Sequence, residues 1–231
     1  MTDAGSRVSV ALVGAGSMGS LHARMIAQSS RADLASVIDI DPIAGRAVAD
    51  RYGVPWTPEL SELCGVHAVV LAATTEAHYE LAARVLECGA PLLIEKPLTT
   101  CLEQSRQIVS LAEQKSVPLM CGLQERYNPA MLTVLSMLDR PIHVAGIRHA
   151  PYAPRIRTGV AWDLMVHDVD LTLRVFGGGE PERVQIGLGY FHPLSLTGEE
   201  DVAEAVLGFP SGELAVLSAS RIAQRKVRSL A

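Results

Sequence analysis

A glycine-rich turn near the start of the chain constrains the fold more than any other feature. Residues 8–13 (VSVALV) form an apolar run of the kind found in buried parallel strands. Residues 17–28 then carry apolar side chains at helical spacing. Between them the chain reads Gly14-Ala15-Gly16-Ser17-Met18-Gly19. A strand, a Gly-x-Gly-x-x-Gly turn and a helix in this order predict a βαβ unit that binds a dinucleotide.

Each glycine of this turn has a predicted role. Gly14 permits the tight turn, Gly16 lets the backbone approach a pyrophosphate, and Gly19 lets the helix pack on the strand. The helix start supplies free N–H groups for the phosphates. We therefore expect the cofactor-binding residues to include Gly14, Ala15, Gly16, Ser17, Met18 and Gly19. The alternative is a glycine-rich turn that binds nothing.

An acidic residue follows the second apolar run, residues 34–38. Asp39 stands where a carboxylate accepts the ribose hydroxyls of NAD and repels the 2′-phosphate of NADP. No arginine or lysine follows it directly, so NAD is favoured over NADP. The alternative is that Asp41 caps the next helix and Asp39 is merely exposed.

Strand-like and helical segments alternate over the first half of the chain. We expect strands at 34–38, 68–73, 92–94 and 117–121, and helices at 43–52, 77–88 and 102–114. This alternation predicts an α/β fold with a doubly wound parallel sheet, a Rossmann domain covering residues 1–123.

The pattern changes after residue 122. Helices are expected at 129–138 and 163–176, and strands at 142–149, 184–188, 202–209, 213–219 and 226–230. Strands in succession predict an α+β domain with an open, mostly antiparallel sheet over residues 124–231. The chain ends inside the last expected strand, so we expect a partner subunit, in a homodimer or homotetramer, or further sequence to cover that edge.

Composition excludes several classes of protein. The net charge of −5 argues against nucleic-acid binding, and the apolar runs are too short to span a membrane. No signal peptide is recognisable, so a cytoplasmic protein is expected. The four cysteines have long, irregular gaps that suggest neither a metal site nor a disulfide framework, and we expect them to be small buried hydrophobes.

Two later segments carry candidate chemistry. Glu95-Lys96-Pro97 follows the expected strand 92–94, where ligands of a doubly wound sheet bind, so Lys96 is expected to face the cofactor. The alternative is an exposed turn with a charged pair. Asp163 and His167 lie four residues apart on one expected helix and share a face.

Three interpretations of Asp163 and His167 compete. Asp163 is the N-cap of its helix, or the two residues form a metal site with Asp170, or they are a proton-transfer pair near a nicotinamide. The glycine-rich turn favours the third interpretation, and no metal is expected.

Four separated motifs together resemble the Gfo/Idh/MocA family, the glucose-fructose oxidoreductase and inositol dehydrogenase group. Gly14–Gly19 with His22 is similar to its GxGxxGxxH opening, and Glu95-Lys96-Pro97 to its EKP signature. Residues 125–130 (ERYNPA) resemble an ERFNPA segment of one branch, and residues 162–168 resemble its D-x-x-x-H helix. That branch includes UDP-N-acetylhexosamine 3-dehydrogenases.

The resemblance implies an NAD-dependent oxidoreductase that transfers a hydride between nicotinamide and a secondary alcohol of a sugar, nucleotide sugar or cyclitol. It implies that Lys96, His167 and Asp163 are catalytic, with His167 as the base. The implied substrate-pocket residues are Arg126, Tyr127, Asn128, Trp162, Asp163 and His167. The implied further cofactor contacts are Ala73, Thr74, His78, Glu95 and Lys96.

The chain departs from the family pattern in two ways, and two sets of alternatives stay open. The family usually has Thr-Pro where this chain has Ala73-Thr74, and its members are usually longer, so the second domain is expected to be truncated. Arg155 and Arg157 are expected either to meet a nucleotide diphosphate or to be solvated charges. The alternative functions are a nicotinamide-binding regulatory or scaffold protein without turnover, and a metal hydrolase.

Overall fold

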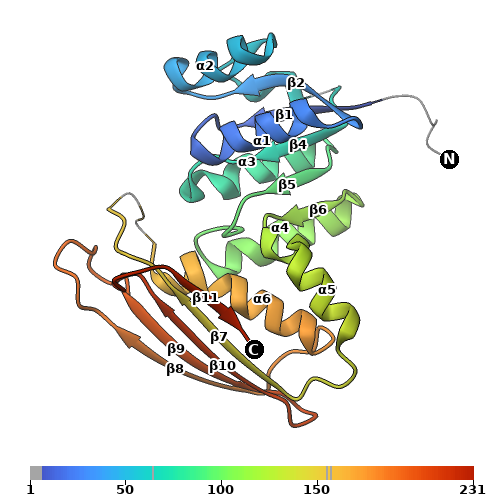
Figure 1. Ribbon diagram of the computed structural model, residues 1–231. Coiled ribbons are helices and arrows are strands. Elements are labelled where there is room, and N and C mark those ends of the chain that lie inside the picture. Colours follow the sequence, from blue (N-terminus) through green and yellow to red (C-terminus); the bar gives the residue numbers. More distant parts are fainter. Residues whose placement is uncertain (1–6, 64, 155, 157) are drawn as a thin grey trace. The chain divides into compact units, whose positions relative to one another are not determined.

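The computed structural model describes residues 7–63, 65–154, 156 and 158–231 (Figure 1). The chain divides into two compact units, Met1–Gly122 and Leu123–Ala231. Each unit contains its own sheet.

The first unit is a six-stranded sheet with the order β3-β2-β1-β4-β5-β6, and all of its pairings are parallel. Its strands are β1 (Val8–Val13), β2 (Ala32–Ile38), β3 (Trp56–Thr57), β4 (Ala68–Leu71), β5 (Leu92–Ile94) and β6 (Leu119–Cys121). Its helices are α1 (Ser17–Gln28), α2 (Pro42–Tyr52), α3 (Thr75–Glu87) and α4 (Leu102–Lys115), with a 3₁₀ turn at Leu60–Leu63. The strand order reverses between β1 and β4, and ligands of such sheets bind at that point.

Both faces of this sheet are covered, which explains why β1 is apolar throughout. Ala11 and Val13 pack in a cluster with side chains of α3 and α4, while Val10 and Leu12 pack with side chains of α1 and α2. A strand buried on both faces reads as a continuous apolar run instead of an alternating one. The predicted doubly wound α/β architecture is confirmed.

The second unit is a five-stranded sheet with the order β11-β7-β10-β9-β8. Its strands are β7 (His143–His149), β8 (Arg183–Gly189), β9 (Val202–Gly208), β10 (Leu214–Ser220) and β11 (Val227–Leu230). Its helical segments are a 3₁₀ turn at Gln124–Tyr127, α5 (Pro129–Met137), a π-helical turn at Ala161–Met165 and α6 (Val166–Val175). The β7–β10 pairing is parallel and the other three are antiparallel, so the sheet is mostly antiparallel as expected.

One face of the second sheet carries the core of that unit. Met165 and partly buried residues of α6 pack onto Ala203, Ala205 and Ala215, and α6 lies along this face of the sheet (Figure 1). Small side chains on the strands let the helix backbone approach the sheet closely. Packing on the sheet therefore fixes the direction of α6. It also fixes the positions of Asp163 and His167 within this unit.

The structure corrects two expectations and adds one strand that was not predicted. Asp163 is not an N-cap, because the helical segment begins two residues earlier, at Ala161, and its N-cap is Val160. The strand β3 was not predicted, since two residues show no periodicity. The cysteines are not uniformly buried: Cys88 and Cys101 are exposed and Cys121 is half-buried, whereas Cys64 lies outside the described residues.

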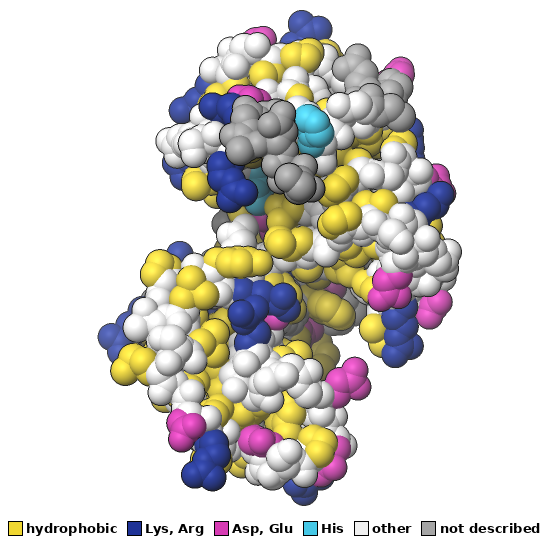
Figure 2. All heavy atoms as spheres, turned by 90° about the vertical axis from the view of Figure 1, so that its right-hand side faces the viewer, with side chains coloured by type: hydrophobic (Ala, Val, Ile, Leu, Met, Phe, Trp, Pro, Cys, Tyr) yellow, Lys and Arg dark blue, Asp and Glu magenta, His cyan; other side chains and the backbone are white. Residues whose placement is uncertain are grey.

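Acidic and basic side chains are interspersed over the face drawn in Figure 2. Within the described ranges, every helix falls short of the length and apolar character needed to cross a membrane.

Candidate functional site

The glycine-rich turn is built so that only glycine fits at two of its positions. Gly14 has a φ of +93°, and a Cβ there would overlap with the backbone of Ala72 and Ala73 after β4. A Cβ on Gly19 would overlap with the carbonyl of Gly14. Gly16 differs, because a Cβ there would meet nothing and the residue is exposed. The outer side of the turn at Gly16 is therefore open to a ligand.

The start of α1 leaves its positive end available. Gly16 is the N-cap and offers no side-chain hydrogen bond, and the first turn contains no acidic residue. Ser17 and Met18 are exposed beside it. The unsatisfied N–H groups of a helix start carry partial positive charge, which suits the phosphates of a dinucleotide.

Asp39 lies one residue beyond β2 and is held against the glycine-rich turn. Its Oδ2 accepts a hydrogen bond from the N–H of Ala15 at 2.5 Å, and its Oδ1 accepts one from Asp41 at 2.8 Å. Asp41 in turn caps α2 by accepting from the N–H of Ile43 at 2.8 Å. Asp41 is thus the cap that the alternative interpretation required. Asp39, however, is half-buried beside the turn.

Two further turns of the first unit carry the remaining predicted residues. Ala73 is half-buried after β4, and Thr74 is the exposed N-cap residue of α3. Glu95 and Lys96 follow β5, where Glu95 is buried and Lys96 is half-buried. His78 of α3 is only 1% exposed. All of these turns lie at the carboxyl edge of the sheet, together with Gly14–Gly19 and Asp39.

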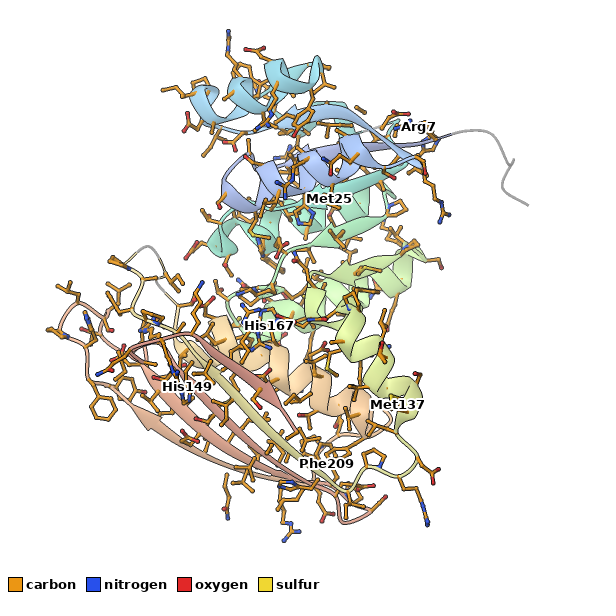
Figure 3. The ribbon with its side chains drawn as sticks, viewed as in Figure 1. Arg7, Met25, Met137, His149, His167 and Phe209 are labelled. Atoms are coloured by element: carbon orange, nitrogen blue, oxygen red, sulfur yellow. The ribbon has the colours of Figure 1, made fainter. Side chains whose placement is uncertain are left out.

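In the second unit, Trp162, Asp163 and His167 share the start of the long helical segment. Trp162 is 47% exposed and lies in the π-helical turn with Asp163, which is half-buried. His167 lies at the beginning of α6 and is half-buried (Figure 3). Wide π-helical turns occur often at functional sites. The structure therefore brings Asp163 and His167 together on one helix.

A cluster that sequence reasoning missed fixes this helix start. Glu200 accepts a hydrogen bond from the N–H of Ala161 at 2.7 Å, so it caps the helical segment from a distant loop. Arg221 donates to the carbonyl of Thr158 at 2.6 Å and to Asp201 at 2.9 Å. The run Glu199-Glu200-Asp201 gives no sequence signal of this role, because its partners lie far away in the chain.

Asp201 is fully buried and richly hydrogen-bonded. It accepts from the N–H groups of Phe191 and His192, both at 2.7 Å, and from the hydroxyl of Ser195. Burial alone would raise the pKa of Asp201, but these hydrogen bonds and the one from Arg221 lower it well below its ordinary value. Asp201 is therefore charged in the folded protein at neutral pH.

The segment 125–128 is tied to α6 by an ion pair between the half-buried Arg126 and the buried Asp170. The Nε of Arg126 donates to both oxygens of Asp170, at 2.8 and 2.7 Å. Asn128 caps α5 by accepting from the N–H of Ala130 at 3.0 Å, and Tyr127 is 57% exposed. Because Asp170 already faces a cation, it is a poor member of a metal site. The described residues contain no group of three or more His, Cys, Asp or Glu side chains suited to hold a metal.

Glu125 belongs to a second charged group of this unit. Arg148 donates to Glu125 at 3.1 Å and to Asp168 at 2.7 Å, and Arg228 donates to Glu125 at 3.0 Å. Burial raises the pKa of Glu125, but the hydrogen bonds from Asn128 and Arg148 and the charges of Arg148 and Arg228 outweigh it and lower the pKa. Glu125 of the ERYNPA segment and Asp168 of the helix motif thus share the Arg148 cation within this unit. Arg155 and Arg157 lie outside the described residues.

The comparisons with known proteins identify the family. Residues 8–123 match the family model described as "Oxidoreductase family, NAD-binding Rossmann fold", and residues 137–230 match the GFO/IDH/MocA C-terminal domain. The chain belongs to the Gfo/Idh/MocA family. Membership confirms the resemblance drawn from the four motifs, and with it the expectation of an oxidoreductase.

Gfo/Idh/MocA relatives match over nearly the whole chain. UDP-N-acetylglucosamine 3-dehydrogenase of Acidithiobacillus ferrooxidans is 30% identical over 95% of this chain and 69% of the relative. Inositol 2-dehydrogenase of Rhizobium meliloti is 27% identical over 91% of this chain and 68% of the relative.

Solved structures of the family agree with the fold. A crystal form of the Acidithiobacillus enzyme gives a TM-score of 0.89 at 29% identity, covering 98% of this chain and 71% of that one. GenD2 from gentamicin A biosynthesis, solved in complex with NAD, gives 0.89 at 26% identity, covering 99% of this chain and 70% of that one.

Proposed function

We propose that this chain is an NAD-dependent dehydrogenase acting on a secondary alcohol of a sugar, nucleotide sugar or cyclitol. The observation that carries the proposal is the glycine-rich turn with Asp39 hydrogen-bonded to Ala15 at the same edge of the sheet as Lys96. The printed names of the relatives, a UDP-N-acetylglucosamine 3-dehydrogenase and an inositol 2-dehydrogenase, supply the substrate classes.

The residues at this edge fit a dinucleotide. The space outside Gly16 is open, and the start of α1 has no acidic side chain of its own to compete with phosphates. In the proposal the cofactor contacts are Gly14–Gly19, Asp39, Ala73, Thr74 and Lys96. When bound, NAD supplies the acceptor for the hydride that leaves the substrate carbon.

The preference for NAD over NADP is part of the proposal and rests on Asp39. Its carboxylate can accept hydrogen bonds from ribose hydroxyls, whereas it would repel a 2′-phosphate. The hydrogen bond from Ala15 fixes the carboxylate beside the turn, so the side chain needs little reorganisation to meet the ribose.

Three side chains are proposed to act on the substrate. His167 accepts the proton of the substrate hydroxyl, since a histidine is the usual base near neutral pH. Lys96 donates a hydrogen bond to the same oxygen and stabilises its developing negative charge. Asp163, on the same helix as His167, orients the substrate or the imidazole. Lys96 belongs to the first unit and His167 to the second.

The second unit is proposed to bind the substrate and to mediate self-association. Arg126, Tyr127, Asn128 and Trp162 are the proposed pocket residues. Asn128 also caps α5 and Arg126 also binds Asp170, so both have fixed positions. On the sheet face opposite α6, Val206 and Val216 are 36% and 39% exposed, which favours a homodimer or homotetramer formed over this face.

Activity screening tests the proposed function. The purified protein is incubated with NAD and a panel of UDP-sugars, free cyclitols and free sugars, and the absorbance of reduced nicotinamide is followed. Oxidation of at least one class, abolished in a Lys96→Ala variant, is the expected result. Tight NAD binding with no turnover on any class would instead support the regulatory or scaffold alternative.

A further inference from the structure

The turn Glu95-Lys96-Pro97 is held by two histidines from different helices. His22 comes from α1 and His78 from α3, and each contacts a different residue of the turn. Lys96, between the two anchored residues, is the side chain to which the proposed function gives a role. This arrangement lies wholly within the first unit.

His22 holds the first residue of the turn through a side chain. Its Nε2 lies 2.7 Å from Oε1 of Glu95, and both side chains are largely buried. The other oxygen of Glu95 accepts a hydrogen bond from the backbone N–H of Lys96 at 3.2 Å. A Cβ on Gly122 would press on the Glu95 backbone and carboxylate, at 3.1 Å from each. The Glu95 carboxylate thus connects α1 to the backbone of Lys96.

His78 holds the last residue of the turn through the backbone. Its Nδ1 lies 3.0 Å from the carbonyl oxygen of Pro97, and its Nε2 lies 3.2 Å from the carbonyl oxygen of Ala73. The ring is buried, and both nitrogens face acceptors of the protein itself. A ring nitrogen that carries a hydrogen can therefore donate to the carbonyl it faces, in the turn after β5 or in the turn after β4.

We infer that His22 and His78 are positioning residues that together fix the backbone of Lys96. In this inference Glu95 connects His22 to the Lys96 backbone and is not a contact of the cofactor. The inference rests on the proposed function, in which Lys96 acts on the substrate oxygen. A catalytic group displaced by about 1 Å can lose on the order of 100-fold in rate. Fixing the Lys96 backbone from both sides limits such displacement.

Lysine resonances give a direct test that does not require turnover. The chain has three lysines, Lys96, Lys115 and Lys226. Reductive methylation with ¹³C-formaldehyde places an NMR probe on each, and a Lys96→Arg variant assigns the Lys96 signal. We expect the Lys96 methyl signal to shift and broaden in His22→Ala and His78→Ala variants, while the Lys115 signal stays unchanged.

Substitutions that keep a donor or acceptor test the same point if the alanine variants fold poorly. His78→Gln retains an amide donor, and Glu95→Gln retains an acceptor. In both variants the Lys96 signal is therefore expected to lie closer to that of the parent than in the alanine variants. His67→Ala is the matched control, because His67 bonds to Ser9 at the opposite edge of the sheet. This control is expected to leave the Lys96 signal and turnover as in the parent.

Binding and rate measurements separate positioning from cofactor contact. We expect the NAD dissociation constant to change by less than about two-fold in the histidine variants, while kcat falls on the order of 10–100-fold. In a Glu95→Ala background, His22→Ala is expected to lower kcat no further, because the two residues act through one contact.

Two results would overturn the inference. One is an unchanged Lys96 signal in both alanine variants, whatever their activity. The other is a loss of NAD affinity of tenfold or more in either histidine variant, which would make that histidine a cofactor contact. If the Lys96 signal responds as expected but no alcohol is oxidised, the proposed function fails and the positioning role stands.

Discussion

Replacing Asp201 tests whether its buried ion pair with Arg221 stabilises the second unit. Asp201 is fully buried and accepts four hydrogen bonds, including one from Arg221, whose side chain is also buried. Asp201→Asn removes the charge, turns one acceptor into a donor and leaves the Arg221 cation without its anion. Removing one partner of a buried ion pair costs about 3–5 kcal/mol.

The assay is urea unfolding at neutral pH, with Asp33→Asn as the matched control. Asp33 pairs with Arg7 at 2.9 Å, but both side chains are about half exposed, so its loss should cost at most about 1 kcal/mol. A free energy of unfolding for Asp201→Asn within 1 kcal/mol of that for Asp33→Asn would refute the reasoning.

The same variant predicts a dependence on pH. Folding lowers the pKa of Asp201, so its charged form stabilises the fold above the ordinary carboxyl value of about 4, and this contribution is lost as the pH falls toward the folded-state pKa. The difference in unfolding free energy between the parent and Asp201→Asn should therefore shrink below about pH 4. A difference that stays constant from pH 7 to pH 3 would contradict the lowered pKa.

The remaining predictions concern the proposed chemistry. Asp39→Ala should reduce the difference in binding free energy between NADP and NAD, measured by calorimetry, by about 1–3 kcal/mol. Equal dissociation constants for the two cofactors in the parent would contradict the role of Asp39. Lys96→Ala should lower kcat strongly with little change in NAD affinity, because its hydrogen bond strengthens in the transition state. His167→Ala should lower kcat by ~10²–10⁴-fold and remove an ionisation from the acid limb of the pH–rate profile; near-normal kcat in this variant would shift the role of base to another residue.

The fold was predictable where local patterns decide the structure. Val8–Val13 and Ser17–Gln28 have the predicted bounds because an apolar run and a helical period are both read from neighbouring residues. The π-helical turn at Ala161–Met165 was not predictable, because its start depends on Glu200 from a distant loop. The residues next to this turn in the sequence do not reveal a partner that is almost 40 residues away.

The candidate site was predictable as motifs but not as contacts. Gly14–Gly19, His22 and Glu95 were each recognised in the sequence, yet nothing in the sequence shows that His22 meets Glu95. That contact depends on how α1 and β5 lie on the same sheet. Family resemblance names residues, whereas the three-dimensional arrangement shows which of them act through one another.

The order of strands in the second sheet has a consequence for synthesis on the ribosome. Strand β7 lies between β10 and β11, which are the last two strands of this sequence. Neither ladder of β7 can therefore form before the residues of β10 and β11, at 214–220 and 227–230, have been translated. The first unit, whose β1 to β6 lie within the first 121 residues, can complete its sheet while β7 is still unpaired. During this interval β7 presents unpaired N–H and C=O groups along both of its edges, the arrangement that invites wrong strand pairing.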